Sequence, residues 1–238
     1  MSLLHSSGVN PQQLDGRPAE LLEPALDAFL TTGGREAVLL PLFFGPSAAL
    51  TDYVPTRLAA LRARHPQATF RLADALVRAD EPADTRIAQA LADEVRARQA
   101  ASALGRVPVI LVDHGTPQPA VTAIREYLGG QLRRELGDAV SVVITASMER
   151  REGPEYAFNE PLLEHALRQP PFNTGDVIIA LQFLAPGRHA GAEGDIAAIC
   201  GAAEAEQPGL RTHATATLGA HPQVIAVLAD RFRAAALR

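Results

Sequence analysis

The ten residues 107–116, V-P-V-I-L-V-D-H-G-T, constrain the fold of this chain more than any other stretch. Residues 109–112 form a short apolar run that is β-branched at both ends, which is typical of a strand buried on both faces of a parallel sheet. Polar and small residues from Asp113 onward end the run abruptly, and a helical pattern follows. The stretch therefore predicts a strand–loop–helix unit with His114 at the carboxyl end of the strand, the edge at which open α/β sheets bind ligands.

Strand and helix patterns alternate along the whole chain. The expected strands cover 1–6, 37–44, 68–73, 107–113, 140–146, 177–184 and 211–217. The expected helices cover 18–30, 55–64, 85–98, 121–136, 160–168, 195–206 and a final stretch from Pro222. Apolar spacing supports these helices, as with Ile87, Leu91 and Val95 on one face after Asp84 as the expected cap. The alternation predicts an α/β protein whose parallel, doubly wound sheets are flanked by helices.

The first half of the sequence matches the second at an offset of 140 residues, without gaps over about 45 residues, so that Phe43, for example, falls on Phe183. The order of the expected elements agrees as well. We interpret the match as a duplication, with one lobe over 1–104 and a second over 105–238. The first lobe has no counterpart of 107–136 and so lacks an opening strand and helix. We expect the natural chain to begin further upstream, because a half-sheet would expose unpaired strand edges.

Composition and charge exclude several classes of protein. The 22 basic and 27 acidic residues give a net charge of −5, and no basic patch interleaved with aromatic residues is present, which argues against a nucleic-acid partner. The single cysteine, Cys200, excludes a disulfide framework and is expected to be a small buried hydrophobe in a reducing compartment. No apolar run reaches the roughly 18 residues of a membrane span, and no signal peptide is evident. We expect a cytoplasmic protein without a membrane partner, and leave open whether it forms a homo-oligomer.

Two histidines of the second half follow strand ends. His114 follows the strand 107–113, and His189 follows the strand 177–184. Because the carboxyl ends of parallel strands share one edge, we expect the two imidazoles to face each other across a crevice. Two imidazoles can hold Fe, Co, Ni or Zn and leave coordination positions open, and a neutral imidazole can also accept a proton. The alternative is a capping or packing role for each ring.

Three motifs in the second half resemble those of the class II tetrapyrrole chelatases. H-G-T at 114–116 resembles the family's H-G-S, and 183–196 resembles its F-L-x-x-G-x-H-x-x-x-D-I segment. Residues 218–220 with the following helix resemble its closing L-G-x-x-P element. Together they resemble the CbiX-like sirohydrochlorin chelatases, over most of 107–238 and, through the repeat, over 1–98.

The resemblance implies two ferrochelatase-like lobes and the insertion of Co²⁺ or Fe²⁺ into sirohydrochlorin or a related tetrapyrrole, in cobalamin or sirohaem biosynthesis. The family's metal-binding histidines correspond to His114 and His189. No permanently bound cofactor is implied, since the divalent ion is a substrate. In the first lobe Ala49 takes the place of His189, so only the second lobe is expected to hold the metal. One departure is clear: the family spaces histidine and aspartate as H-x3-D, whereas here Glu193 has that spacing and Asp195 lies two residues further on.

The implied reaction suggests further catalytic candidates. Two pyrrole N–H protons leave as the metal enters, so a base is needed. His114 and His189 are expected to act as ligands first and as proton acceptors afterwards. Glu149 is the candidate for a third ligand or a proton outlet, and its alternative is a solvated loop residue.

Sirohydrochlorin carries many carboxylates, so an acidic protein must supply local positive charge. Guanidinium groups pair with carboxylates bidentately, and arginines lie in the two loops expected beside the crevice. The candidates are Arg150, Arg151 and Arg188, each with the alternative of a plain surface charge. Gly115 permits close approach of the backbone, and Thr116 with the start of helix 121–136 is expected to receive an anion.

Other reactive residues fit less well. Four histidines are interpreted as structural: His65, His165, His213 and His221. His5 ends the first expected strand and is a candidate for a place in the interlobe crevice. The pair Ser6 and Ser7 lies near it, but the chain has no G-x-S-x-G elbow and no glycine-rich phosphate loop.

Two alternative functions stay open at this point. One is a metal or tetrapyrrole carrier without turnover, which the shifted spacing between His189 and Asp195 and the vacated site in the first lobe would suit. The other is an unrelated α/β hydrolase that uses Asp113 and His114, for which no nucleophile is identified.

Overall fold

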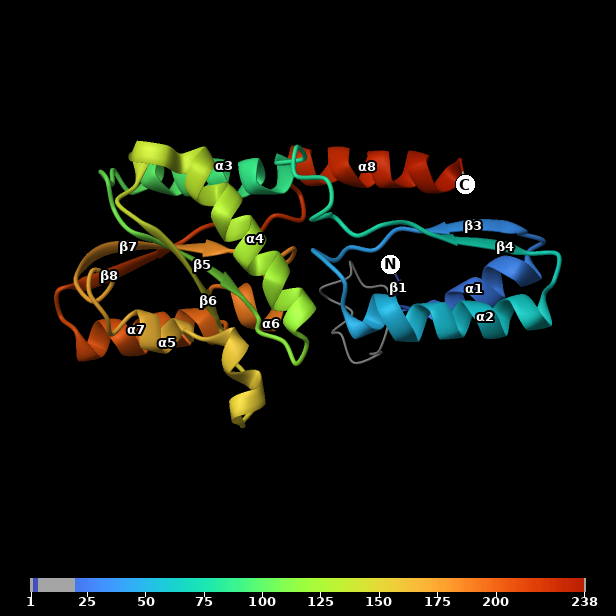
Figure 1. Ribbon diagram of the computed structural model, residues 1–238, viewed down its shortest axis with the longest axis horizontal. Coiled ribbons are helices and arrows are strands. Elements are labelled where there is room, and N and C mark those ends of the chain that lie inside the picture. The colour runs from blue at the N-terminus through green and yellow to red at the C-terminus, as the bar shows by residue number, and fades with distance from the viewer. Residues whose placement is uncertain (1, 4–19, 238) are drawn as a thin grey trace. The chain divides into compact units, whose positions relative to one another are not determined.

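The computed structural model describes residues 2–3 and 20–237 (Figure 1). Their contacts form two compact units. Unit 1 contains the described residues up to Pro41, with 46–74 and 232–237, and unit 2 contains 42–45 and 75–231. The lobes 1–104 and 105–238 were predicted from the internal repeat and not from contacts, and this division of the chain stays a prediction. His5, Ser6 and Ser7 lie outside the described residues.

Within the described residues, unit 2 is built on a four-stranded parallel sheet in the order β6-β5-β7-β8. Its strands are β5 (Val109–Asp113), β6 (Val143–Ser147), β7 (Gly175–Leu181) and β8 (Leu210–Ala214). The strand expected from the V-I-L-V run is β5, which lies between β6 and β7 with all of its residues buried. The doubly wound parallel sheet predicted for this half of the chain is therefore confirmed.

Helices cover both faces of this sheet (Figure 1). One layer contains α3 (Arg86–Ala101), α4 (Pro119–Leu136) and α8 (Pro222–Ala236) as far as Arg231; the other contains α5 (Leu163–Ala166) and α7 (Asp195–Glu206). Along β5, Val109 and Leu111 pack with the first layer and Ile110 and Val112 with the second. Each fully buried aliphatic side chain contributes about 1.5–3 kcal/mol, so burial on both faces fixes β5 at the centre of the sheet.

Three shorter segments connect these elements in unit 2. They are η3 (Gly137–Ala139) and η4 (Pro154–Asn159), both 3-10 helices, and the one-turn helix α6 (Gly187–Ala190).

Unit 1 contains smaller elements of the same kind. Its strands are β1 (Ser2–Leu3) paired with β2 (Glu20–Leu21), and β3 (Glu36–Leu39) paired with β4 (Thr69–Leu72), all parallel. Its helices are α1 (Leu22–Thr31), the π-helical η2 (Ala49–Tyr53) and α2 (Val54–Arg64). A small apolar core lies between them, in which Leu58 and Leu61 are almost completely buried.

The strand registers support the internal repeat and refine its alignment. Glu36 pairs with Thr69, 33 positions later, whereas Asp176 pairs with Arg211, 35 positions later. The second half therefore has two additional residues between its paired strands. The loop between His189 and the start of α7 lies in this interval, and it is the same loop whose spacing departs from the H-x3-D pattern.

Equivalent helices protect the edge strands β4 and β8. The Arg62 side chain donates to the carbonyl oxygen of Phe70 at 2.5 Å, and the Glu204 carboxylate accepts the N–H of Thr212 at 2.7 Å. Allowing for the two additional residues, these pairs occupy matching positions in the two halves. A side chain of opposite charge performs the same task in each, which is to satisfy a backbone group of an edge strand.

Several expected elements have different bounds. The helix expected over 160–168 is present but shorter. Glu160 is extended before Pro161, as residues before proline favour, and only Leu163–Ala166 is helical. The strand expected over 37–44 covers only Glu36–Leu39, and Pro41, which has no N–H to donate, lies just beyond its end. The residues after it are not all buried; Leu42, for example, is 49% exposed. The helix expected from 18 begins at Leu22.

Helix α3 has the buried face that was expected, with Val95 fully buried. Its N-cap residue, however, is Thr85, whereas Asp84 accepts the N–H of Arg86 at 3.4 Å from one position earlier.

Two expectations from composition can be compared with the described residues. Cys200 is buried on α7, as expected, and burial raises the pKa of its thiol to about 11. Among the described helices, none combines the length and the apolar character needed to cross a membrane.

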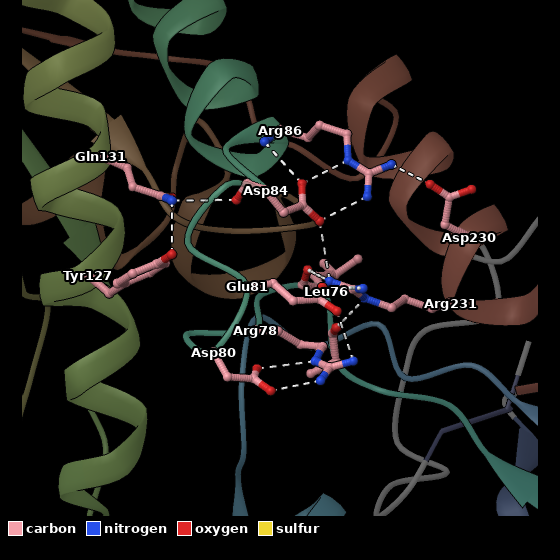
Figure 2. Close-up of polar contacts among 11 residues, drawn as sticks. Leu76, Arg78, Asp80, Glu81, Asp84, Arg86, Tyr127, Gln131, Asp230 and Arg231 are labelled. Carbon is pink, nitrogen blue, oxygen red and sulfur yellow. Dashed lines mark hydrogen bonds and ion pairs between the residues drawn. The ribbon is translucent and has the colours of Figure 1, made fainter. Parts of the chain in front are cut away.

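A charged network joins the segment 75–86 to α8 in unit 2 (Figure 2). Arg231 is only 7% exposed and donates to the carbonyl oxygen of Leu76 at 3.3 Å, to Glu81 at 3.0 Å and to Asp84 at 3.4 Å. Asp84 also accepts from the Arg86 side chain at 2.8 Å. The segment that leads into α3 is therefore held by ionic contacts as well as by apolar packing.

The same network reaches α4 through an amide. The Gln131 side chain donates to the carbonyl oxygen of Asp84 at 3.4 Å and to the hydroxyl of Tyr127 at 3.1 Å (Figure 2). Arg86 completes it with a contact to Asp230 of α8 at 2.6 Å.

We expect Arg231→Met to lower the free energy of unfolding by about 3 kcal/mol, because it removes a buried guanidinium that binds two carboxylates and the carbonyl groups of Ala75 and Leu76. Urea unfolding followed by circular dichroism measures this change. Arg96→Met is the matched control, since Arg96 is 47% exposed and its pair with Asp93 should contribute less than about 1 kcal/mol. Equal effects of the two substitutions would contradict a stabilising role of the buried network.

Acid should weaken this network. Hydrogen bonds from the Arg86 side chain hold the pKa of Asp84 below its ordinary value, although burial acts in the opposite direction. A carboxyl with a lowered pKa in the folded state stabilises the protein above its unfolded pKa and loses that contribution as the pH falls through the folded value. The stability gap between wild type and Asp84→Asn should therefore narrow from neutral pH towards about pH 3. Unfolding midpoints at several pH values test this, and a constant gap would refute it.

Candidate functional site

The carboxyl ends of β5 and β7 form a topological switch point. From β5 the chain continues through α4 to β6 on one side, whereas from β7 it continues through α7 to β8 on the other. Open α/β sheets bind ligands at such a point, because the two connections diverge and leave a crevice. His114 directly follows β5, and His189 lies in α6, after β7.

The structure brings the two imidazoles together, as the sequence analysis expected. The ring centroids of His114 and His189 are 4.6 Å apart, with an angle of 78° between the ring planes. The side chains are 46% and 32% exposed, respectively, so both rings are within reach of a ligand. Their role as metal ligands stays a prediction.

Hydrogen bonds orient both rings in the same sense. Nδ1 of His189 lies 2.6 Å from Oδ2 of Asp195, and Nδ1 of His114 lies 3.1 Å from the carbonyl oxygen of Gly115. Because both partners are acceptors, a ring that carries its proton on Nδ1 keeps the lone pair of Nε2 for a cation. The contacts favour this tautomer for His189, whereas Nε2 of His114 also faces an acceptor, Oε1 of Glu149 at 3.5 Å. A carboxylate behind a histidine increases its basicity as a ligand.

Asp195, and not Glu193, is the carboxylate that orients His189. The two additional residues of this loop are absorbed before α7, where the backbone at Gly194 is so close that a Cβ there would be 2.6 Å from the carbonyl oxygen of His189. Asp195 is the first residue of α7 and reaches the ring from there, while Glu193 is exposed. His189 therefore has a carboxylate partner even though the spacing departs from the H-x3-D pattern.

Glu149 lies beside His114. The N–H of Glu149 donates to the carbonyl oxygen of His114 at 3.2 Å, and its Oε1 is 3.5 Å from Nε2 of that ring. Gly115 permits this approach: its φ is +92°, and a Cβ at this position would collide with the carbonyl oxygen of Glu149. Among the described residues, no group of three or more His, Cys, Asp or Glu side chains is arranged to hold a metal ion. A role of Glu149 as a third ligand stays a prediction.

A buried polar network supports the loop that carries His114. Arg125 of α4 is 1% exposed and contacts Ser147, and it lies 3.4 Å from Oδ1 of Asp113. Asp113 also accepts from the Ser147 hydroxyl at 2.8 Å and from the N–H of Gly115 at 3.1 Å. Burial raises the pKa of Asp113, and Arg125 with these donors acts against that rise. Asp113 therefore supports the loop and does not orient His114, which removes the basis of the hydrolase alternative.

Asn159 holds the next residue of the same loop. Its side chain accepts the N–H of Thr116 at 3.0 Å and donates to the carbonyl oxygen of Thr116 at 2.9 Å. The Thr116 hydroxyl accepts the N–H of Gln118 at 3.1 Å. The N–H groups of Thr116 and Gln118 thus already donate hydrogen bonds within the protein. They are not available to the anion that was expected to bind at Thr116 and the start of the following helix.

Arg125, Ser147 and Asn159 were not predicted from the sequence. A signal existed for Arg125, which lies on the face of α4 that also carries Ile124 and Leu128; an arginine on an apolar face indicates a buried charge with a partner. Nothing local marks Ser147 or Asn159, because their partners lie in other elements.

The three predicted arginines differ in their contacts. Arg150 donates to Glu160 at 2.8 Å and to the carbonyl oxygen of Gly153 at 3.0 Å, so it organises its own loop. Burial acts to raise the pKa of Glu160, but hydrogen bonds from His165 and Arg150 lower it below the ordinary value. Arg151 lies over the ring of Tyr156, 5.9 Å from its centroid.

Arg188 directly precedes His189 in α6. Its side chain is 84% exposed, and its Nε is 3.8 Å from Oδ2 of Asp195. Contacts of the three arginines with a substrate stay predictions.

The remaining described histidines have local partners. His165 contacts Glu160 at 3.2 Å, His213 contacts Asp176 at 2.8 Å, and the His221 ring accepts the N–H of Gln223 at 3.2 Å. His65 follows the last residue of α2. These positions agree with the structural roles expected for them.

Comparison with known proteins shows to which family the chain belongs. A profile of the CbiX family matches residues 108–235, more than half of the chain, and the chain therefore belongs to this family of class II chelatases. A search of curated proteins by sequence gave no significant match.

Solved structures share the fold. SirB from Bacillus subtilis with Fe³⁺ superimposes with a TM-score of 0.63 at 17% identity, covering 91% of this chain and 77% of that chain. The sirohydrochlorin chelatase SirB from Bacillus subtilis subspecies spizizenii, in complex with cobalt, gives 0.63 at 17% identity and covers 98% and 92%. CbiX, described as the terminal enzyme of sirohaem biosynthesis in denitrifying bacteria, gives 0.58 at 14% identity and covers 98% and 96%.

If Asp195 orients His189, Asp195→Ala should weaken the binding of Co²⁺ by roughly tenfold or more, as losses of such supporting carboxylates do. Isothermal titration calorimetry under anaerobic conditions measures the affinity. Glu193→Ala is the matched control, because Glu193 has the family's spacing but is exposed. A larger loss with Glu193→Ala than with Asp195→Ala would show that the assignment is wrong.

Proposed function

We propose that this chain inserts a divalent metal, Co²⁺ or Fe²⁺, into sirohydrochlorin or a related carboxylated tetrapyrrole. The observation that carries the proposal is the pair of imidazoles at the switch point, 4.6 Å apart and each with its Nδ1 engaged by an acceptor. Membership of the CbiX family supports a chelatase, and the fold is shared with a sirohydrochlorin chelatase crystallised with cobalt.

In this proposal His114 and His189 hold the incoming ion through Nε2. Two nitrogen ligands leave positions that water fills first and that the nitrogens of the macrocycle fill afterwards. The ion brings two positive charges and two pyrrole N–H protons leave, so the charge of the metallated macrocycle is unchanged. The imidazoles are then free to accept these protons. Glu149, 3.5 Å from His114 and 61% exposed, connects that ring to solvent.

Arginines beside the pair are proposed to bind the peripheral carboxylates of the macrocycle. Arg188 is 84% exposed, and Arg151 is exposed and lies over Tyr156. Arg150 is proposed to act mainly by holding its loop, since Glu160 already pairs with it. We place the reaction in the cytoplasm, in sirohaem or cobalamin synthesis, with the metal as a substrate and no permanently bound cofactor.

A carrier that binds metal or tetrapyrrole without turnover is the second candidate. The exposed pair of rings supports it, because two imidazoles alone bind an ion weakly enough to release it. The unusual spacing between His189 and Asp195 was an argument for the carrier. Because Asp195 still contacts His189, this spacing no longer argues against catalysis.

The test is an anaerobic absorbance assay of sirohydrochlorin with Co²⁺, Fe²⁺ and Ni²⁺. We expect the wild type to exceed the spontaneous rate with repeated turnover, and His114→Ala and His189→Ala each to lose at least about 100-fold, the order of effect of a positioned acid–base group. His213→Ala is the matched control, because His213 also contacts an aspartate through a ring nitrogen but lies in β8. Binding of the metal or of sirohydrochlorin, with a rate of insertion equal to that of the enzyme-free control, would favour the carrier. A rate equal to the control without binding of either ligand would remove both candidates.

A further inference from the structure

Gln182 is the first residue after β7 and lies at the switch point. Its N–H donates to the carbonyl oxygen of Val112 at 2.9 Å, so the pairing of β5 with β7 extends to it. Leu181 is the register partner of Val112, which makes Gln182 the neighbour of Asp113 across the two strands. Side chains alternate along β7, and Ala180 packs in the layer of α3 and α4. Gln182 therefore follows Ala180 on the face of the sheet that carries Asp113 and Arg125.

The Gln182 side chain is buried but has an unsatisfied oxygen. The residue is 7% exposed, and its Oε1 is one of three buried side-chain oxygen or nitrogen atoms, among the described residues, without a hydrogen-bond partner. Its neighbours at the same end of the sheet, Asp113 and Ser147, are fully engaged with each other and with Arg125. An unsatisfied buried amide oxygen is unfavourable, so this oxygen is available to a donor from outside the described chain.

The internal repeat has no amide at the matching position. At the offset of 140, Gln182 corresponds to Leu42 of the first half. Leu42 is 49% exposed and Gln182 is 7% exposed, so the two positions differ in burial as well as in polarity. The polar residue occurs in the half of the chain that carries the histidine pair.

We propose that Gln182 is a substrate-binding residue whose carboxamide accepts a hydrogen bond from the bound substrate; this rests on the function proposed above. The ligand must bring an N–H or O–H donor. Ionised carboxylates at the rim of the macrocycle are acceptors only and do not fit. The donors that remain are the pyrrole N–H groups of the metal-free macrocycle and a water molecule on the incoming ion.

The experiment compares Gln182→Met with the matched substitution Gln131→Met. Both glutamines are buried, at 7% and 2% exposure, but Gln131 donates to Tyr127 and to a backbone carbonyl. Binding of metal-free sirohydrochlorin is measured by absorbance, and binding of Co²⁺ by calorimetry. Urea unfolding is measured on the same proteins, and Gln182→Leu is the second variant if Gln182→Met does not fold.

We expect Gln182→Met to unfold at the same or a higher urea concentration than the wild type and to bind one ligand roughly tenfold more weakly. Gln131→Met should unfold at a lower concentration and bind both ligands normally. A loss in the macrocycle arm identifies the pyrrole N–H as the donor, and a loss in the Co²⁺ arm identifies water on the ion.

Unchanged affinity in both arms for a folded Gln182 variant overturns the proposal, as does a loss of stability equal to that of Gln131→Met. If the wild type and Gln182→Met bind both ligands equally well, the role proposed for Gln182 is wrong, but the proposed chelatase function is not affected. A wild type that binds neither ligand removes the proposed function as well.

Discussion

The parallel pairing of β5 with β7 is the constraint on which the candidate site depends. Both strands are buried on both faces, and a shift of register by one residue would exchange the faces of every side chain. The apolar layers above and below therefore fix the register with Val112 opposite Leu181. Because His114 lies two residues beyond that pair and His189 follows in the next loop, the burial of apolar side chains determines where the two imidazoles meet.

Packing alone would leave the strand-end loop free to move, and a polar network prevents this. Asp113 and Arg125 are buried together, and each is costly to bury without the other. Their contacts with Ser147 and Gly115 connect the loop to β6 and α4. The site is thus supported by groups that have no contact with a substrate in the proposed reaction. Supports of this kind set the position of reactive groups more precisely than a loop could by itself.

The two halves of the chain follow one plan and have diverged in particular places. Arg62 and Glu204 occupy equivalent positions and have opposite charges, and each forms a hydrogen bond with a backbone group of an edge strand. The two halves therefore share the position of this contact but not the residue that makes it. The second half has two additional residues before α7 and a histidine where the first has Ala49. The chemistry of the proposed site is therefore a property of the second half, built on a framework that both halves contain.

The sequence by itself determined the central strand, the alternation of strands and helices, and the two histidines at strand ends, because these depend on local apolar patterns and on the rule that parallel strands end at one edge. It did not give the short helix after Pro161, where the residue before a proline stays extended, or the partners of Arg125, Ser147 and Asn159, which lie in distant elements. Only the tertiary structure decided that Asp195 reaches His189 across a lengthened loop and that Gln182 is buried without a partner. These features depend on the path of the backbone and on all the residues that surround a side chain. Neither can be read from a single stretch of the sequence, because the surrounding residues come from distant elements.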